Sequence, residues 1–329
     1  MLPIAVDAMG GDNAPGEIVA GARQAAEAGT PVILVGRPDA IGDPGPCQVL
    51  EASEVIEMHD DPAQGVRRKK DSSLVRAAEA VRDGRAGAMV SAGNTGATMG
   101  SALLRMGRIK GVSRPAIATP IPVPGALPTV LLDAGANAEC QASWLVQFAQ
   151  MGTVFARERF GIDRPRVGLL SIGEEPTKGT ALEKETHQLL QVTDGVNFVG
   201  NVEGRDIMTP DLDVVVTDGF TGNVVLKTLE GGMRTLINAL FGVFASSDEA
   251  KAAADVLMPA LLPLYDQLDP DTYGGAVLLG VDGVCIISHG SSSAKALVNA
   301  IGVAREMVES DLVGLMRAAV AGEPSQAHK

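Results

Sequence analysis

Short apolar segments recur along the chain, and most are followed directly by a polar loop rich in small residues. They are Pro3–Val6, Pro31–Val35, Ala86–Ser91, Ile117–Val123, Thr129–Leu132, Arg166–Ser171, Asp213–Thr217 and Val284–Ser288. Strands that are apolar on both faces are typical of a parallel sheet that helices cover on both sides. The pattern therefore predicts an α/β fold with a doubly wound, mostly parallel sheet.

Longer helical patterns separate these segments. They lie at Ala138–Phe160, Val224–Phe244, Ala250–Gln267 and Ser292–Ala319, with earlier helices ending near Ala28 and running from Ser72 or Ser73 to Asp83. No linker rich in Ser, Pro or Gly divides the chain, which predicts a single domain of one or two lobes over residues 1–329. We expect a helical hairpin at about residues 231–268 to be inserted in it, and the tail Gly322–Lys329 to be frayed.

The composition excludes several classes of protein. A formal net charge of -13 argues against nonspecific binding to nucleic acid. Cys47, Cys140 and Cys285 are far apart in the sequence, so neither a disulfide framework nor a zinc site is expected. The amino terminus does not resemble a signal peptide, and no apolar run reaches the roughly 18 residues that span a bilayer. We expect a cytoplasmic protein, at most peripheral at the inner face of the cell membrane.

Six loops that follow apolar segments are candidates for a ligand site. They begin at Asp7, Ala92, Asp133, Ser171, Thr217 and Ser288. Ligands of open parallel sheets bind beyond the carboxyl ends of the strands, so we expect these loops to meet at one edge. Two of them run straight into helices, at Thr95 and at Ser292, where free N–H groups and the helix dipole favour an anion. Together the loops predict a polar site of the size of phosphate.

Named catalytic motifs do not fit the chain. It has no dinucleotide-binding Gly-x-Gly-x-x-Gly, no Walker A loop, no Gly-x-Ser-x-Gly elbow and no cluster at metal-ligand spacing, so neither a metal nor a cofactor is expected. Of the four histidines, His289 directly follows an apolar segment and is the one that we place in the site. An ordinary structural histidine at a strand end is an equally good interpretation. His59, His187 and His328 lie in polar surroundings and are expected at the surface.

Two further segments suggest interactions with partners. The run Arg67-Arg68-Lys69-Lys70 is dense in positive charge within an acidic chain, so it is either a solvated turn or a docking site for an acidic protein. The segment Leu236–Tyr265 has more apolar residues than one helix face needs. Internal packing or a dimer interface explains it better than contact with lipid, which stays as an alternative.

Taken together, these loops resemble the PlsX-type phosphate acyltransferase family over nearly the whole chain. The resemblance is carried by IAVDAMGGDNAP at Ile4–Pro15, RRKKDSS at Arg67–Ser73, SAGNTGA at Ser91–Ala97, LLDAGAN at Leu131–Asn137, GLLSIGEEPTKG at Gly168–Gly179, FVGNVEGRD at Phe198–Asp206, DVVVTDGFTGN at Asp213–Asn223 and the segment Tyr273–Ala294. Val277 departs from the family, which usually has proline there, and this puts the local turn in doubt.

The resemblance implies a fold like that of phosphotransacetylases and isocitrate dehydrogenases. It also implies transfer of a fatty acyl group from acyl carrier protein to inorganic phosphate, giving an acyl phosphate that a glycerol-3-phosphate acyltransferase uses next. Members are usually homodimers that are peripheral at a membrane surface. The family's active-site lysine and asparagine match Lys178 and Asn223. From the loops themselves we take as substrate- or phosphate-binding candidates Asp7, Gly10, Gly11, Gly93, Asn94, Thr95, Gly96, Asn137, Asp218, Gly222, His289, Gly290 and Ser291.

The transfer that the resemblance implies needs none of the motifs that the chain lacks. Phosphate is itself the nucleophile, so the protein has to orient it beside the thioester, which alone can supply ~7–11 kcal/mol. The protein must also donate hydrogen bonds to the developing oxyanion, each worth ~3–4 kcal/mol. Three rival functions stay open: a phosphotransacetylase-like enzyme that uses a coenzyme A thioester, a dehydrogenase of the same fold, and a non-catalytic membrane scaffold for lipid enzymes.

Overall fold

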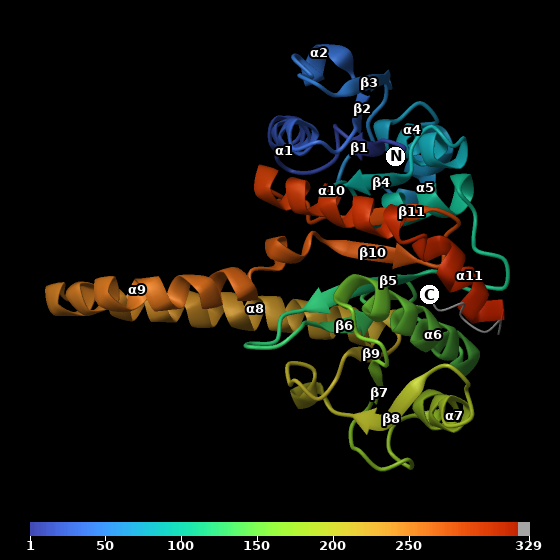
Figure 1. The fold of residues 1–329 in the computed structure, drawn as a ribbon, viewed down its shortest axis with the longest axis vertical. Coiled ribbons are helices and arrows are strands. Elements are labelled where there is room, and N and C mark those ends of the chain that lie inside the picture. The colour runs from blue at the N-terminus through green and yellow to red at the C-terminus, as the bar shows by residue number, and fades with distance from the viewer. Residues whose placement is uncertain (322–329) are drawn as a thin grey trace.

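Eleven strands form one continuous sheet within residues 1–321, the part of the chain that the computed structural model describes. The strand order is β3-β2-β1-β4-β11-β10-β5-β6-β9-β7-β8 (Figure 1). The strands are β1 Ile4–Asp7, β2 Val32–Gly36, β3 Gln48–Glu51, β4 Ala88–Ser91, β5 Ala116–Ile121, β6 Thr129–Leu132, β7 Arg166–Leu170, β8 Asn197–Val202, β9 Val214–Val216, β10 Ala276–Leu279 and β11 Val284–Ile287. Seven of the ten neighbouring pairs are parallel, which confirms the mostly parallel sheet.

Helices cover both faces of this sheet, as predicted. One face carries α1 Gly16–Glu27, α2 Pro38–Ile41, α6 Ala142–Phe160, α7 Ala181–Leu190, α10 Ala294–Glu309 and α11 Leu312–Ala321. The other carries α3 Pro62–Arg68, α4 Ser73–Arg82, α5 Thr95–Arg105 and the start of α8 Gly219–Phe244. Two short 3-10 helices, η1 Gly204–Asp206 and η2 Pro270–Tyr273, complete the pattern. Ser72 caps α4 through its hydroxyl.

The two halves of the sheet point in opposite directions, which corrects the expectation of a single ligand-binding edge. Strands β10 and β11 are antiparallel, as are β10 and β5, and β5 and β6. Three reversals in succession leave β6, β9 and β7 antiparallel to β1, β4 and β11. The loops after β1, β4 and β11 therefore lie at one edge, and the loops after β6, β7 and β9 lie at the other.

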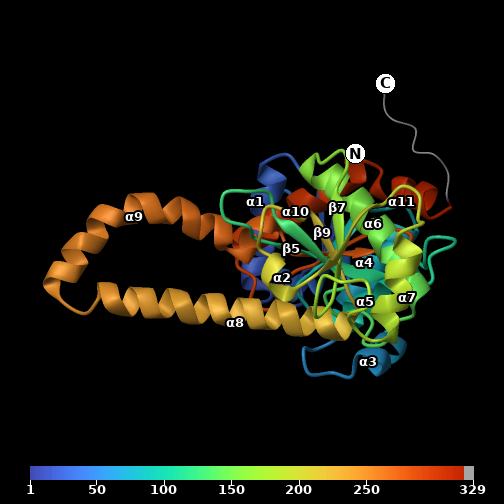
Figure 2. The same cartoon turned by 90° about the horizontal axis from the view of Figure 1, so that it is seen from below.

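The predicted hairpin is present and extends beyond the body of the protein (Figures 1 and 2). It consists of α8 and of α9 Asp248–Leu268, so α8 begins before the expected Val224. Gln267 fixes the base of α9, because its amide nitrogen donates to the carbonyl groups of Val123 at 3.2 Å and Ala126 at 3.3 Å. None of the helices in residues 1–321 combines the length and the apolar character that a bilayer-spanning segment needs.

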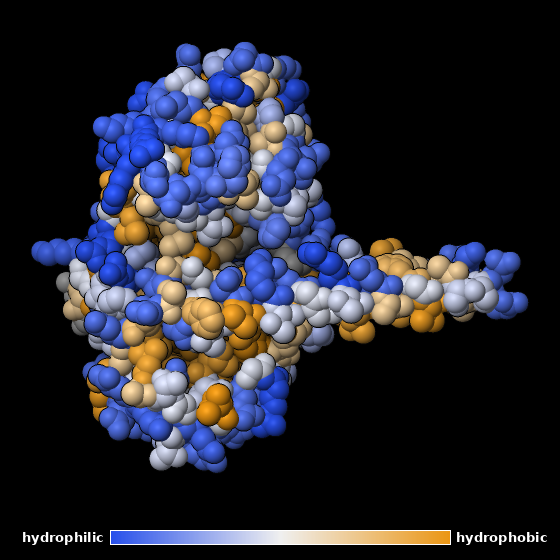
Figure 3. All heavy atoms as spheres, turned by 180° about the vertical axis from the view of Figure 1, so that it is seen from behind, coloured by the Kyte–Doolittle hydropathy of each residue, from blue (hydrophilic) through white to orange (hydrophobic). Residues whose placement is uncertain are grey.

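Apolar side chains lie exposed along both arms of the hairpin. Figure 3 shows them on the projecting part of the molecule. They include Leu236, Leu240, Phe241, Val243, Val256, Leu257, Leu262, Leu264 and Tyr265. In α8 and α9 the buried residues are Gly219, Gly222 and Ala254. The hairpin is therefore not packed against the body along its length.

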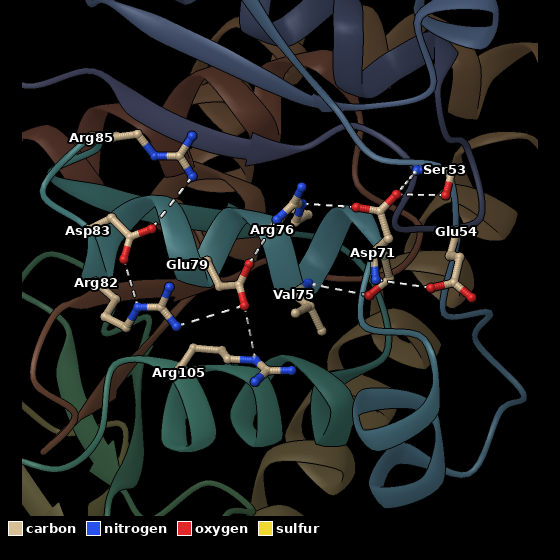
Figure 4. A network of polar contacts seen from close by, with 11 residues as sticks. Ser53, Glu54, Asp71, Val75, Arg76, Glu79, Arg82, Asp83, Arg85 and Arg105 are labelled. Carbon is tan, nitrogen blue, oxygen red and sulfur yellow. Dashed lines mark hydrogen bonds and ion pairs between the residues drawn. The ribbon is translucent and has the colours of Figure 1, made fainter.

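A charged network ties α4 to the carboxyl end of α5 (Figure 4). Glu79 on α4 contacts Arg76 at 3.3 Å, Arg82 at 3.8 Å and Arg105 of α5 at 3.6 Å. Single exposed ion pairs contribute little, but Glu79 is mostly buried and shared among three arginines. The network therefore fixes the carboxyl end of α5 against α4.

The expected helix Ser292–Ala319 is wrong in one respect, since α10 and α11 are separate. The break is at Ser310 and Asp311, where Asp311 has a positive φ of 51°. Asp311 caps the next helix by accepting a hydrogen bond from the Gly314 N–H. The tail that we expected to be frayed and His328 lie outside the described residues.

Candidate active site

The loops after β1, β4 and β11 form a tight group, which we call the amino-terminal loop cluster (residues 8–13, 92–94 and 288–293). The Asp12 N–H donates to the Gly290 carbonyl at 2.7 Å, and the Asn13 amide donates to the Ser291 carbonyl at 3.1 Å. A side-chain carbon at Gly10 would overlap the Asp7 carboxylate and lie 2.9 Å from the Cα of Gly93. The expected convergence of these three loops is confirmed, and glycine is required where they touch.

Asp7 lies beneath this cluster rather than in it. Its carboxylate accepts hydrogen bonds from the Met9 N–H at 3.3 Å and from the Ser91 hydroxyl at 2.8 Å. The Ser91 oxygen in turn accepts from the Gly93 N–H at 3.0 Å. Burial raises the pKa of Asp7 above its ordinary value, and the hydrogen bonds oppose that rise. Asp7 therefore orients the loops, and its side chain is too buried to touch a ligand.

The loops after β6 and β9 form a second group, the central loop cluster (residues 133–137 and 217–223). Asp133 is fully buried and accepts from the N–H groups of Ile117, Gly135, Ala136 and Asn137, at 2.8–3.1 Å, and from the Asn137 amide at 2.9 Å. Burial raises its pKa.

The start of α8 is locked onto this cluster. The Gly219 N–H donates to the Asn137 carbonyl at 2.7 Å, and a side-chain carbon at Gly222 would overlap the Asp133 carbonyl oxygen. Asp218 caps α8 by accepting from the Thr221 N–H at 2.9 Å. Asn137, Asp218 and Gly222 therefore build the scaffold of the site. Because Asp218 is the cap, Asn223 in the second turn has no capping role.

A cavity of about 340 Å³ lies between the two clusters, and we call it the reaction cavity. Its walls come from the amino-terminal loop cluster, from β5, from η2 and from α8. Five of the predicted residues line it, namely Gly93, Thr95, Asn223, His289 and Gly290, and Ser291 lines the adjoining groove. The other predicted glycines and Asn94 lie behind this surface, where Asn94 caps α5 and donates to the Met58 carbonyl at 3.0 Å.

His289 is poised to donate a hydrogen bond into the cavity. Its Nδ1 faces the Ser291 hydroxyl at 2.8 Å and accepts from the Ser291 N–H at 3.3 Å. A neutral ring whose Nδ1 accepts has its proton on Nε2. His289 is exposed, so this nitrogen can reach a ligand.

Several cavity residues were not predicted. Thr119 on β5 has a buried hydroxyl oxygen without a hydrogen-bond partner among the described residues. Lys227 lies one helical turn after Asn223 and pairs with Glu230 at 2.8 Å. Asp12 and Asp271 also line the wall, and burial together with the nearby Asp269 raises the pKa of Asp271. Two sequence features could have pointed to them. Thr119 is a polar residue within an apolar strand, and Lys227 lies four residues after Asn223 and so on the same helix face.

Lys178 lies outside the cavity lining, exposed in the loop after β7. The adjacent strand β8 holds this loop, because the Asn201 amide donates to the Glu175 carbonyl at 2.9 Å. That carbonyl also accepts from the Lys178 N–H at 3.0 Å. The role of Lys178 thus stays a prediction.

The helix end at Ser292 is already satisfied by the protein, contrary to expectation. The Ala294 N–H donates to a carboxylate oxygen of Glu17 at 2.7 Å, and the Ala296 N–H donates to the Ser293 hydroxyl. At the other predicted helix end, Thr95 opens α5 and faces the cavity. There too one N–H is already capped, since the Asn94 side chain accepts from the Ala97 N–H at 3.0 Å.

The basic run begins in the last turn of α3 and continues past its end, while the start of α3 lies beside the amino-terminal loop cluster. Pro62 of α3 lies 2.8 Å from a side-chain carbon placed at Gly96, and Asn94 donates to the carbonyl of Asp60 at 3.3 Å. Arg67, Arg68 and Lys70 are exposed, whereas Lys69 is paired with Asp60 at 2.6 Å and donates to the Val55 carbonyl. Lys69 is therefore a structural residue of this run.

The prediction for His187 is wrong, because it is buried between α7 and β8. Its Nδ1 lies 2.9 Å from the Asn201 amide oxygen, and its ring packs edge-on against Phe198. Its hydrogen-bond partners are Asn201 and Gln191, so the polar residues that flank it in the sequence were a misleading sign of exposure. His59 is exposed, as predicted.

The family of the chain follows from comparison with known proteins. The family model described as "Fatty acid synthesis protein" matches residues 2–314. A protein named "Phosphate acyltransferase" from Pelotomaculum thermopropionicum is 50% identical over 97% of this chain and 95% of its own length. One with the same name from Heliobacterium modesticaldum is 48% identical over 98% of both. The chain belongs to the PlsX-type phosphate acyltransferase family. As a member of that family it is an acyltransferase.

Solved structures support the fold of the family. A phosphotransacetylase from Streptococcus pyogenes superposes with a TM-score of 0.62 over 94% of both chains, at 18% identity. The EutD phosphotransacetylase from Staphylococcus aureus gives 0.61 over 93% of this chain and 94% of that one, at 15% identity. The expected phosphotransacetylase-like fold is confirmed.

Proposed function

We propose that this acyltransferase moves a fatty acyl group from acyl carrier protein to inorganic phosphate, giving an acyl phosphate for phospholipid synthesis. The near-complete match to proteins named phosphate acyltransferase carries the proposal. The reaction cavity supports it with polar side chains of the right kind. Asn223, His289 and Thr119 all line one space that can hold phosphate beside a thioester carbonyl.

The charge of the cavity constrains the roles of the residues. Asp12, Glu230 and Asp271 are acidic, and Lys227, which lines the same wall, is already paired with Glu230. A dianionic phosphate would therefore need an additional cation. We propose that Lys178 supplies it from the loop after β7, while Asn223 donates to the phosphate or to the oxyanion. The family resemblance assigns the same two residues.

One assay tests the reaction. The purified protein is incubated with long-chain acyl-acyl-carrier-protein and phosphate, and acyl phosphate is trapped with hydroxylamine. Product that depends on both substrates is expected. A parallel reaction with acyl coenzyme A distinguishes the phosphotransacetylase-like alternative, and absence of product from either donor would contradict the proposal.

Two alanine variants test the site. Lys178→Ala and Asn223→Ala should each lower turnover ~100-fold or more, as loss of a preorganised donor does, with melting temperatures close to the parent. Lys178→Arg should not restore full activity, because the guanidinium is larger and planar. Activity within a few fold of the parent would move the site toward His289 and Thr119.

The partners of the enzyme belong to the same proposal. Arg67, Arg68 and Lys70 are exposed at the end of α3 and just after it, and three exposed positive charges suit an acidic carrier protein. The exposed apolar residues of the hairpin suit a homodimer interface, with lipid contact near its tip. Replacing Phe241 and Phe244 by polar residues should weaken self-association, binding to liposomes, or both. Unchanged sedimentation and liposome flotation would assign the hairpin neither role.

A further inference from the structure

A second cavity, of about 410 Å³, runs along the base of the hairpin, and we call it the hairpin groove. It is continuous with the reaction cavity, because the two share the lining residues Thr119, Pro120, Leu226, Glu230, Asp271 and His289. A ligand held at Asn223 can therefore extend into the groove without crossing the protein.

The lining of the groove becomes apolar away from the reaction cavity. Along α8 the side chains of Leu226, Leu229, Met233 and Ile237 recur every three or four residues and so lie on one face. The opposite walls come from the end of β5 with the next residue (Pro120, Ile121 and Pro122), and from Tyr265 and Leu268 on α9.

Polar residues of the same helix segment lie toward solvent. Arg234 and Asn238 are exposed, whereas Met233 and Ile237 are half-buried. The groove thus has an apolar floor and a polar margin, as a site for a long hydrocarbon requires.

The groove has the length of one lipid chain. From Leu226 to Ile237 the helix advances ~16 Å at its standard rise. One leaflet of a bilayer, half of a hydrocarbon core that is ~30 Å thick, is ~15 Å deep. An acyl chain of the length found in membrane lipids would therefore fill the groove.

We propose that the hairpin groove binds the acyl chain of the thioester donor, with its carbonyl end beside Asn223 and its methyl end near Ile237. The inference rests on the proposed function and extends it, since the distance from Asn223 to the far end of the groove then sets the chain length that the enzyme prefers. Met233 and Ile237 are specificity-determining residues at successive depths.

Blocking the far end tests the inference. Ile237→Trp should lower kcat/KM for a palmitoyl donor by about fourfold for each methylene displaced (about 0.8 kcal/mol), and should leave an octanoyl donor nearly unaffected. Met233→Trp lies closer to Asn223 and should also affect donors of intermediate length. Leu236→Trp is the matched control, because Leu236 is 71% exposed and does not line the groove. Equal losses for both donors, no loss with either, or the same pattern in the control would overturn the inference.

A binding measurement separates this inference from the proposed function. Titration calorimetry with octyl- and hexadecylphosphonate reports chain binding without turnover. Ile237→Trp should weaken only the hexadecyl compound, with sedimentation unchanged. If the parent makes no acyl phosphate, the proposed function fails, and this titration still decides the groove. Altered self-association with unchanged chain-length preference would mean that a second copy of the chain fills the groove, and the inference would fall.

Discussion

The amino-terminal and central loop clusters solve the same structural problem in different ways. In each, an aspartate stands at the carboxyl end of a buried strand, as the last residue of β1 or directly after β6, and alanine and a glycine-rich loop follow. Burial raises the pKa of both carboxyl groups. Asp7 has a serine hydroxyl among its partners, which can rotate and change its role. Asp133 is held by backbone N–H groups from four residues. An N–H group can only donate, and its direction is fixed by the backbone.

The difference shows where the protein tolerates adjustment. The amino-terminal cluster, which lines the cavity with Gly93, His289 and Gly290, rests on a support that can rearrange its hydrogen bonds. The central cluster fixes the first turn of α8, and with it Asn223, through donors of fixed direction. We expect substitutions in the central cluster to cost more stability than equivalent substitutions in the amino-terminal one.

The largest effect is expected at Gly222. In Gly222→Ala the added carbon collides with the Asp133 carbonyl, and a backbone atom inside a buried cluster cannot move aside cheaply. The free energy of unfolding should fall by about 3 kcal/mol or more. Gly232→Ala is the matched control in the same helix, because nothing lies within 4 Å of its added carbon. It should stabilise the helix by about 0.5–1 kcal/mol. Urea unfolding measures both, and similar values for the two would break the comparison.

The two aspartates should respond differently to the same change. Asp133→Asn turns one acceptor into a donor facing the Asn137 N–H, which leaves buried donors without partners and should cost about 2–3 kcal/mol. Asp7→Asn should cost under about 1 kcal/mol, because the Ser91 hydroxyl can accept from the new amide. Both values come from urea unfolding at neutral pH. If Asp7→Asn lost more unfolding free energy than Asp133→Asn, the amino-terminal loop cluster would be the more rigid of the two.

The pH dependence of stability sharpens the case of Asp7. Since its pKa in the folded protein is raised above 3.8, the folded state binds this proton more tightly than the unfolded chain does. Its contribution is fully present below pH 3.8 and is lost as pH rises through the folded pKa. Asp7→Asn removes that contribution, so relative to the parent it should become more stable as pH rises from 4 to neutrality. A constant difference across this range would show that the pKa of Asp7 is not raised.

The smallest effect is expected at the exposed basic residues at the end of α3. Neutralising Arg67, Arg68 and Lys70 should raise the Michaelis constant for acyl carrier protein a few fold, more at low salt, and leave that for phosphate unchanged. A control variant neutralises three exposed residues elsewhere, Arg37, Lys110 and Lys184. If both triple variants raise the Michaelis constant for acyl carrier protein equally, the effect comes from net charge and the basic run is not a docking site.

Most of the fold could be predicted because buried strands and long helices leave strong patterns. The direction of the strands could not, since a strand that is apolar on both faces has the same pattern in a parallel and an antiparallel pair. Strand β10 was missed because it begins directly after Gly274 and Gly275, a pair that is typical of a loop. Strands β3 and β8 went unrecognised because they lie at the two edges of the sheet and are partly exposed.

The site could be predicted in part for a related reason. Loops were recognised by their glycines, which mark close approach of the backbone, but a glycine pattern does not tell which loops face a ligand and which support it. Asn137 and Asp218 therefore belong to the scaffold. Thr119 and Lys227 were missed because their roles depend on which face of β5 and α8 meets the cavity, and only the tertiary arrangement decides that.

The long helix α8 acts mechanically as a lever whose short arm carries Asn223. Its 26 residues span about 39 Å, and Asn223 lies only about 6 Å from the first residue. A tilt about the first turn that moves the far end by about 6 Å would shift Asn223 by about 1 Å. A misplacement of about 1 Å can cost roughly 100-fold in rate. The accuracy of the reaction cavity thus depends on how firmly the distant end of the hairpin is held.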